Sequence, residues 1–345
     1  MNRNECRASD YLLNISYAAD RISVVTIKTT NALDILRTAV DSGCHTSLLK
    51  WRFEGDTLTA DDVVRLALEN SLVELEKHTN SDVFFYCGPI VYGTDKVIRD
   101  AVETMQERKK KLLFILETNG GYIEVVQRIA DTLRRHFEVI DFLVPDHALS
   151  AGTVLVMAGD SIWMDYYSVL GPIDPQLPDQ KGGMLPALGY LKQYERFIKK
   201  SARKALTTAE VAFLLEKFDP AELYKFERAR ELSVSLLKEW LVKYKFKNWE
   251  LTQTRNIVVS EKMKKERAEK IARMLLDTDR WNSHGRGISM AVLQKAIQLR
   301  IDDFGQDSTL NSRIRSYCKL VQDYAGKMGK ASFLHTRDEG FKVLF

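Results

Sequence analysis

Short apolar runs alternate with amphipathic stretches through the middle of the chain, between Lys111 and Gln176. Apolar runs at Leu112–Leu116, Val139–Val144 and Ser161–Asp165 have the length and composition of strands. An amphipathic stretch separates the first two runs, and an apolar stretch rich in small residues separates the last two. This order predicts two β–α–β crossover units in a parallel sheet, and therefore an α/β fold.

Glycine-bearing loops follow the first two predicted strands, at Thr118–Gly121 and His147–Thr153. Open α/β sheets usually place their ligands at these carboxyl ends of strands. Glycines there can point backbone N–H groups outward with no side chain in the way. Both loops are therefore candidate parts of one site.

Ser150 has small neighbours and lies where the second loop leads into a predicted helix. The free N–H groups and dipole of a helix N-terminus favour a developing oxyanion. A serine on such a turn is a candidate nucleophile for acyl transfer. The alternative interpretation is a helix-capping serine beside an ordinary glycine turn.

The remaining pattern divides the chain into three parts. Residues 1–80 are predicted to form a mostly helical N-terminal extension, with a short strand at Ile22–Ile27 and helices at Asn31–Ser42 and Thr59–His78. Residues 81–305 are predicted to form the sheet domain, with a helical insertion at about 188–275 that breaks at Asp219-Pro220. Residues 306–345 are predicted to be a tail with one helix, at about Ser308–Tyr324.

A loop rich in proline and glycine follows Gln176, with the sequence LPDQKGGMLPA. Such a segment beside a strand-end site is a candidate flap over that site.

Composition and charge exclude several classes of protein. The chain has 345 residues and a net charge of 51 − 47 = +4, too small to predict a nucleic-acid partner. Its four cysteines show no CxxC spacing, so we predict no zinc site and a reducing cytoplasm. The chain has no apolar run of 18 residues and its start is polar. We therefore expect a cytoplasmic protein with no membrane partner and no cofactor.

Three motifs in sequence order, TNGGYIE, LSAGTVLVMAGDSIWMD and LGPIDPQ, resemble the serine dehydrogenase proteinase family of Clp-fold serine peptidases. These peptidases are relatives of the Clp proteolytic subunit and of signal peptide peptidase A. The resemblance extends from about Asp82 to Asp302. It implies a Clp/crotonase-type fold, a peptide or protein substrate and a homo-oligomer in which the helical insertion makes contacts. It gives Ser150 the role of nucleophile, and with the loop pattern it predicts an oxyanion hole formed by Gly120, Gly121 and Ala151.

A serine nucleophile needs a base, and the resemblance leaves two candidates. The catalytic histidine of the Clp subunit aligns near Gly171-Pro172, where this chain has no imidazole. Relatives similar to signal peptide peptidase use a lysine on a downstream helix, and Lys192 stands 192 − 150 = 42 residues after Ser150. His284 aligns beside the position of the Clp aspartate and is the competitor. A surface lysine and a histidine bonded to backbone are the alternative interpretations.

Three functions remain open from the sequence. The first is a serine endopeptidase that acts on peptides or partly unfolded proteins. The second is a crotonase-like acyl-CoA enzyme, which shares the fold but usually needs glutamate acid/base groups where this chain has Ser150. The third is a non-catalytic scaffold. The resemblance favours the peptidase and leaves the oligomer size and any ATPase partner open.

Overall fold

The computed structural model describes residues 59–173, 184–252, 254–281 and 286–344, and the backbone of short strands at 7–8, 11–17, 23–28, 49–54 and 176–178. The chain divides into two compact units, Met1–Ser71 and Leu72–Phe345. Each unit is described by itself.

The N-terminal unit contains a sheet that the sequence pattern did not predict. Its strands are β1 (Arg7–Ala8), β2 (Tyr11–Tyr17), β3 (Ser23–Lys28) and β4 (Leu49–Glu54). Strand β3 pairs antiparallel with β2 and parallel with β4. The predicted strand is confirmed as β3, but the prediction of a mostly helical extension is wrong for these segments. They are rich in β-branched and aromatic residues, which favour strands over helices. The predicted helix Asn31–Ser42 lies outside the described residues.

Helix α2 (Ala60–Thr79) confirms the predicted helix at 59–78. Thr59 Oγ1 accepts a hydrogen bond from Asp62 N at 3.2 Å, and Asp62 Oδ2 accepts one from Thr59 N at 3.0 Å. This reciprocal pair satisfies backbone N–H groups that the first turn of a helix leaves without partners. The division between the two compact units falls within α2, after Ser71.

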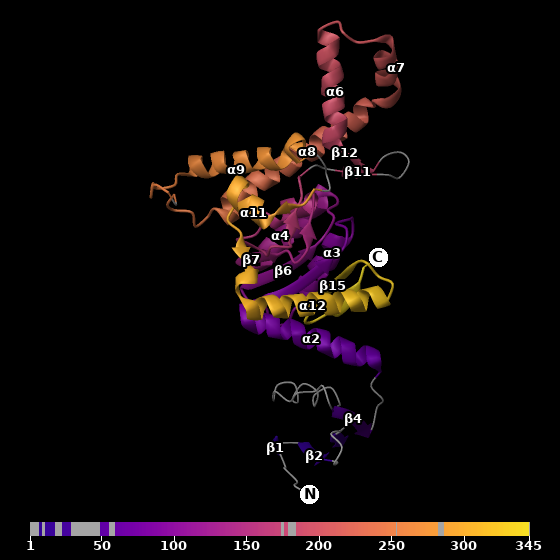
Figure 1. Cartoon of the computed structure of the whole chain (residues 1–345), viewed down its shortest axis with the longest axis vertical. Helices are drawn as coiled ribbons and strands as arrows, with labels where there is room; N and C mark the ends of the chain where they lie inside the picture. Colours follow the sequence, from indigo (N-terminus) through magenta and orange to yellow (C-terminus); the bar gives the residue numbers. More distant parts are fainter. Residues whose placement is uncertain are drawn as a thin grey trace. The chain divides into compact units, whose positions relative to one another are not determined.

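A seven-stranded sheet, in the order β14-β9-β7-β6-β5-β15-β16, forms the centre of the larger unit (Figure 1). Its parallel strands are β5 (Asp82–Cys87), β6 (Lys111–Glu117), β7 (Val139–Leu143), β9 (Ser161–Met164) and β14 (Asp302–Asp303). They confirm the predicted crossover units and the α/β fold class.

Helices cover both faces of the sheet (Figure 1). Helices α3 (Thr94–Glu103), α4 (Ile123–His136) and α5 (Ala151–Val156) pack on the face that carries Phe84, Phe114 and Phe142. The register aligns these three rings across β5, β6 and β7, with centroids 6.3 and 5.6 Å apart. Phe114 is fully buried, so its replacement by alanine should cost roughly 3–5 kcal/mol.

The C-terminal segment completes the sheet and is more than a tail with one helix. The predicted helix is confirmed as α12 (Ser308–Lys327), which packs on the second face, where Tyr317 lies against Phe85 of β5. The strands β15 (Phe333–Thr336) and β16 (Gly340–Val343) then extend the sheet antiparallel beyond β5. The sequence prediction missed both strands because each has only four residues.

The helical insertion is confirmed and has five elements: α6 (Ala187–Ala202), α7 (Thr208–Lys217), α8 (Pro220–Trp240), η2 (Leu241–Lys245) and α9 (Glu261–Leu276). Asp219 caps α8 by accepting a hydrogen bond from Ala221 N at 2.7 Å, and Pro220 begins that helix as predicted. Figure 1 shows α6 and α7 standing away from the sheet, whereas α8 returns toward it and contacts α4 and α5.

Shorter elements connect these parts. The small strands β8 (His147–Ala148), β10 (Val169–Leu170) and β13 (Ile288–Ser289) form a three-stranded sheet, and β11 (Gln176–Pro178) pairs with β12 (Met184–Pro186). The candidate flap is thus a two-stranded hairpin over its described backbone. The remaining short helices are α10 (Thr278–Trp281), α11 (Met290–Val292), η3 (Leu293–Ile297) and η4 (Phe304–Gln306).

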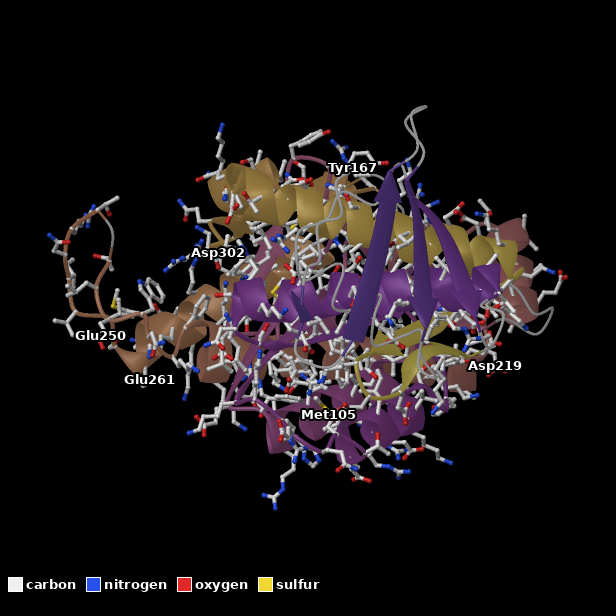
Figure 2. The ribbon with its side chains drawn as sticks, turned by 90° about the horizontal axis from the view of Figure 1, so that it is seen from below. Met105, Tyr167, Asp219, Glu250, Glu261 and Asp302 are labelled. Atoms are coloured by element: carbon white, nitrogen blue, oxygen red, sulfur yellow. The ribbon has the colours of Figure 1, made fainter. Side chains whose placement is uncertain are left out.

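A loop between η2 and α9 extends outward from the helical insertion, with Glu250 and Glu261 near its two ends (Figure 2). Leu251 and Val258 form a bridge across this loop, and both side chains are exposed. Among the helices described, none combines the length and the apolar character that crossing a bilayer requires.

Acid sensitivity of the fold should depend on His335 of β15. This side chain is 1% exposed, and its Nδ1 lies 2.7 Å from the Tyr317 hydroxyl. Burial lowers the pKa of His335 from 6.5 to about 4. The unfolded chain therefore binds more protons between these values, and stability falls as pH falls from 6.5 toward 4.

Both the wild type and His335→Gln should lose unfolding free energy between pH 7 and 4. We expect the loss in the wild type to be larger by roughly 3 kcal/mol. Denaturant unfolding of both proteins at pH 7, 5 and 4 measures this difference. Parallel pH profiles for the two proteins would contradict the assignment to His335.

Candidate active site

Ser150 occupies a strained turn between β8 and α5. Its φ of 51° and ψ of −119° lie where residues with a side chain are rarely found, and it is 4% exposed. Such a conformation costs of order 1–3 kcal/mol and persists only where the surrounding structure imposes it. Nucleophile turns in hydrolases are strained in a similar way.

Thr153 is the side chain that holds this turn in place. Its Oγ1 accepts a hydrogen bond from Gly171 N at 2.9 Å and lies 2.8 Å from Ala148 O. The hydroxyl therefore joins the strand before the turn to the segment after β10. Thr153 is fully buried, so no water competes for these bonds.

The first glycine loop lies directly against the Ser150 turn. Gly120 has a φ of 101°, and a Cβ on it would lie 2.8 Å from Leu149 O and 2.9 Å from Ser150 Cβ. Gly121 has a φ of 156°, and a Cβ there would meet Ile90 O at 2.0 Å. Only glycine fits both positions, as the sequence interpretation of an unobstructed backbone requires.

The hydrogen bonds of this loop distinguish its N–H groups. Gly120 N donates to Thr118 Oγ1 at 3.0 Å, and Tyr122 N donates to Ile90 O at 2.9 Å. Within the described residues, neither Gly121 N nor Ala151 N donates to another backbone group. Of the three predicted oxyanion-hole donors, the geometry therefore favours Gly121 and Ala151 over Gly120.

Ser150, Gly121 and Ala151 line one small pocket. The other lining residues are Tyr122, Ile123, Glu124, Val154, Ile173, Ala229 and Ser233. Helix α8 thus closes this pocket with two small side chains one helical turn apart.

A wider hollow continues from the pocket. It shares Tyr122, Glu124 and Ala229 with the pocket. Its other lining residues are Tyr92, Tyr224, Lys225, Arg228, Glu231, Leu232 and Ser235. The rings of Tyr92 and Tyr122 stack with centroids 4.8 Å apart at its rim.

The two candidate bases differ in how much the structure describes of them. Lys192 is half-buried on α6, beside the buried Leu191, and is not among the described residues that line the pocket. His284 lies outside the described residues. Neither assignment is tested by these contacts.

The lysine with the most strongly shifted pKa lies elsewhere. Burial lowers the pKa of Lys245 in η2 from 10.5 to about 8. The charged groups that act on it are Asp302, Arg300, Asp141 and Asp160, none of which lines the Ser150 pocket. A shifted lysine pKa alone therefore does not identify the base.

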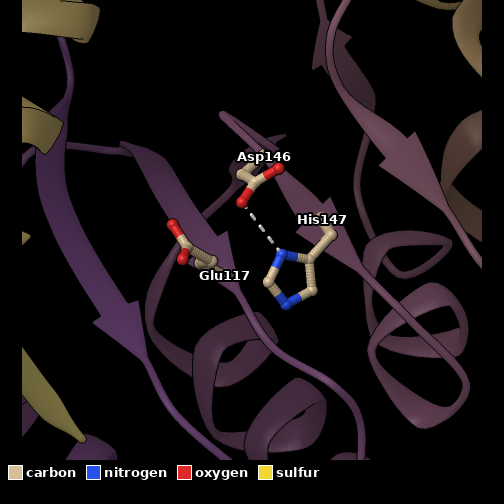
Figure 3. A group of neighbouring side chains, drawn as sticks. All are labelled: Glu117, Asp146 and His147. Carbon is tan, nitrogen blue, oxygen red and sulfur yellow. Dashed lines mark hydrogen bonds and ion pairs between the residues drawn. The ribbon is translucent and has the colours of Figure 1, made fainter. Parts of the chain in front are cut away.

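Glu117, Asp146 and His147 form a second polar group (Figure 3), and Gln322 of α12 donates a hydrogen bond to Glu117. One ligand atom from each lies within 4.8 Å of the others, and His147 Nδ1 is 3.2 Å from Asp146 Oδ2. Burial, and then Asp146, raises the pKa of Glu117. The sequence prediction of no metal site rested on cysteine spacing and did not consider this set.

Sequence reasoning missed several residues of the pocket. Thr153 is part of the motif LSAGTVLVMAGDSIWMD, but we predicted no role for it. A threonine in the first turn after a nucleophile can form hydrogen bonds with backbone groups before and after that turn. Ala229 and Ser233 had no signal, because their motif is an ordinary helix in the sequence. Their position depends on how α8 packs, which only the structure supplies.

The strain at Ser150 predicts that glycine is more stable than alanine at this position. Glycine adopts a φ of 51° without penalty, whereas alanine keeps the clash of the Cβ atom. We expect Ser150→Gly to be more stable than Ser150→Ala by roughly 1 kcal/mol, measured by denaturant unfolding. Equal stability, or a less stable glycine variant, would mean that the turn is not strained.

Two uncharacterized proteins of Methanocaldococcus jannaschii are similar to part of the chain. They are 38% and 32% identical over 98 residues, which is 28% of this chain and 32% of each relative. The chain thus matches about a third of the length of these curated relatives.

Solved structures of membrane-bound stomatin-specific protease variants have a weak similarity to the chain. One, in complex with a substrate peptide, has a TM-score of 0.38 at 15% identity and covers 64% of this chain and 75% of its own. Another has a TM-score of 0.28 at 19% identity and covers 42% and 76%. Similarity at this level carries no weight for function.

Residues 90–250 match the family of ClpP-like SDH-type serine proteinases. The matched segment contains the glycine loop, the Ser150 turn and most of the helical insertion. Over residues 90–250, the chain is therefore similar to the ClpP-like SDH-type serine proteinases, as its motifs predicted.

Proposed function

We propose that this chain is a serine-type endopeptidase that uses Ser150 to cleave peptides or partly unfolded proteins. The observation that carries the proposal is the meeting of Ser150, Gly121 and Ala151 in one pocket, with Ser150 on a strained turn. The family match over residues 90–250 supports the same chemistry.

In the proposed reaction, Ser150 Oγ attacks the scissile carbonyl carbon while a base removes the seryl proton. The carbonyl oxygen becomes an oxyanion that accepts hydrogen bonds from Gly121 N and Ala151 N. The base then protonates the leaving amine as the peptide C–N bond breaks, which leaves an acyl-enzyme. Water deprotonated by the same base attacks the acyl carbon, and Ser150 recovers its proton. Loss of one oxyanion donor typically costs roughly 10²–10³ in rate.

We assign the base to Lys192 and retain His284 as the alternative. Lys192 follows the hairpin after the sheet on a helix that packs against α8, and α8 also lines the Ser150 pocket. A lysine acting alone would need no third catalytic residue, but it must be neutral within about 3 Å of Ser150 Oγ or one water away.

The pocket supports a preference for small side chains on the acyl side of the scissile bond. Ala229 and Ser233 of α8 line this small pocket together with Ser150. The wider hollow, with Tyr92, Tyr122 and Tyr224, offers aromatic surfaces to the rest of an extended peptide.

We also propose a homo-oligomer in which α7 makes contacts between copies. None of the residues of α7 is buried, and Val211, Phe213 and Leu215 are 41%, 48% and 83% exposed. Ile198 of α6 adds a further exposed apolar side chain nearby. An exposed apolar surface of this kind is typical of an interaction site, and a second copy is the occupant that the family resemblance suggests.

A fluorophosphonate probe tests the nucleophile. We expect stoichiometric labelling of the full chain at Ser150, identified by peptide mass spectrometry, and loss of both labelling and peptide cleavage in Ser150→Ala. Ser233→Ala is the matched control, since it removes a second serine hydroxyl from the same pocket and should retain labelling.

The same probe separates the two bases, because labelling requires an activated serine. General-base catalysis contributes roughly 10²–10⁴-fold to a rate, and Lys192→Ala should slow labelling by at least this factor. His284→Ala should slow labelling less. The reverse order would assign the base to His284. Labelling of Ser150→Ala at the wild-type rate would refute the proposed function.

Light scattering tests the assembly. We expect the wild type to be larger than a monomer and Phe213→Ser with Leu215→Ser to be smaller. Tyr166→Ser is the matched control, because Tyr166 is 85% exposed on a different element. A monomeric wild type, or a double variant of unchanged size, would contradict a role for α7 in assembly.

A further inference from the structure

The Glu117 group lies behind the candidate active site and takes no part in the proposed reaction. Glu117 ends β6, Asp146 follows β7, and His147 begins β8. The end of β6 and the connection from β7 into β8 therefore bring two carboxylates and one imidazole together (Figure 3).

We propose that Glu117, Asp146 and His147 bind a divalent transition-metal ion, for which zinc is the best match. One imidazole nitrogen with two carboxylate oxygens is a common donor set for zinc and its neighbours in the first transition row. Calcium and magnesium prefer ligands that are all oxygen, so the imidazole disfavours them.

The distances suit such an ion. Zinc binds nitrogen and carboxylate oxygen at about 2.0–2.2 Å, so neighbouring ligand atoms in a tetrahedral site are about 3.3 Å apart. His147 Nδ1 and Asp146 Oδ2 are already 3.2 Å apart. All three ligand atoms lie within 4.8 Å of one another. A side-chain rotation that moves the Glu117 carboxylate by about 1.5 Å would complete the set.

Charge supplies a separate argument for a cation. Within the described residues, no lysine or arginine forms an ion pair with Glu117 or Asp146, and His147 is the single basic partner of Asp146. Glu117 is half-buried, and among the described residues its carboxylate accepts a hydrogen bond from the neutral Gln322, at 2.6 Å. Arg315 comes near, at 2.7 Å from Pro145 O, but its ion pair is with Asp165. Two carboxylates that share one imidazole leave negative charge uncompensated, which a divalent ion would neutralise.

The site would stabilise the strands that carry both loops of the Ser150 pocket. Thr118 N donates to His147 O at 3.0 Å, and Leu149 N donates to Thr118 O at 2.9 Å. Glu117 and His147 are therefore the residues next to these bonds. An ion that joins their side chains would hold the ends of β6 and β8 together.

Zinc binding to the full metal-free chain at pH 7.5 tests the proposal. We expect equilibrium dialysis to give one zinc ion per chain that Glu117→Gln and His147→Asn each lose. Removal of a residue that only hydrogen-bonds a metal ligand costs roughly 10–100-fold in metal affinity. The zinc affinity of each variant should fall by more than this. Zinc should also raise the Tm of the wild type, and it should leave the Tm of both variants unchanged.

His78 and Asp307 provide the matched control. This exposed pair has the same chemistry at 3.3 Å but no third such ligand within the same reach among the described residues. His78→Asn should therefore leave zinc binding intact. Cobalt substitution provides a second readout, because d–d absorption bands report the coordination geometry without any need for peptidase activity.

Two results would contradict the proposed zinc site. One such result is a wild type that binds no zinc. The other is zinc binding as tight as that of the wild type in Glu117→Gln and His147→Asn, with both variants folded by circular dichroism. Either result would mean that the three residues form an ordinary ion pair with a neighbouring carboxylate. Both variants lie outside the Ser150 pocket, so they should still react with the fluorophosphonate probe. Loss of zinc binding with labelling retained would thus separate the metal site from the proposed peptidase function.

Discussion

The strained backbone of Ser150 is the constraint on which the candidate site depends. A positive φ at a residue with a Cβ persists only because neighbouring groups fix the chain on both sides. Thr153 provides the main restraint, since its buried hydroxyl bonds backbone before and after the turn. The cost of the turn is small compared with the burial of the sheet and its helices, so the fold can sustain it.

The parallel sheet explains why the two loops meet. Strand β6 ends in the glycine loop, and β8 continues beside it through the bonds between Thr118 and the His147–Leu149 segment. Parallel neighbours place their carboxyl ends at one edge, so Gly121 and Ser150 come together although 29 residues separate them (150 − 121). Helix α8 then closes the pocket from the insertion, which makes the shape of the pocket depend on a distant part of the chain.

Local sequence patterns predicted the fold and the nucleophile, but they predicted much less of the rest of the site. Apolar strands followed by glycine loops predicted the parallel sheet, and the small residues around Ser150 predicted its turn. Four-residue strands such as β15 have too little pattern to detect, and the strands β1, β2 and β4 were missed because we interpreted most of that segment as helical. Ala229, Ser233 and the Glu117 group had no local signal, because tertiary packing alone brings them to their places. For the base, spacing suggested Lys192, but spacing does not determine burial or distance, so that assignment stays a prediction.

A crystal structure of the chain with a covalently bound peptide aldehyde tests the central claim most directly. Our account predicts a bond between Ser150 Oγ and the aldehyde carbon, with the resulting oxygen 2.7–3.1 Å from both Gly121 N and Ala151 N. It also predicts that the adjacent side chain points toward Ala229 and Ser233. An adduct on another residue, or an oxygen that turns away from both N–H groups, would contradict it.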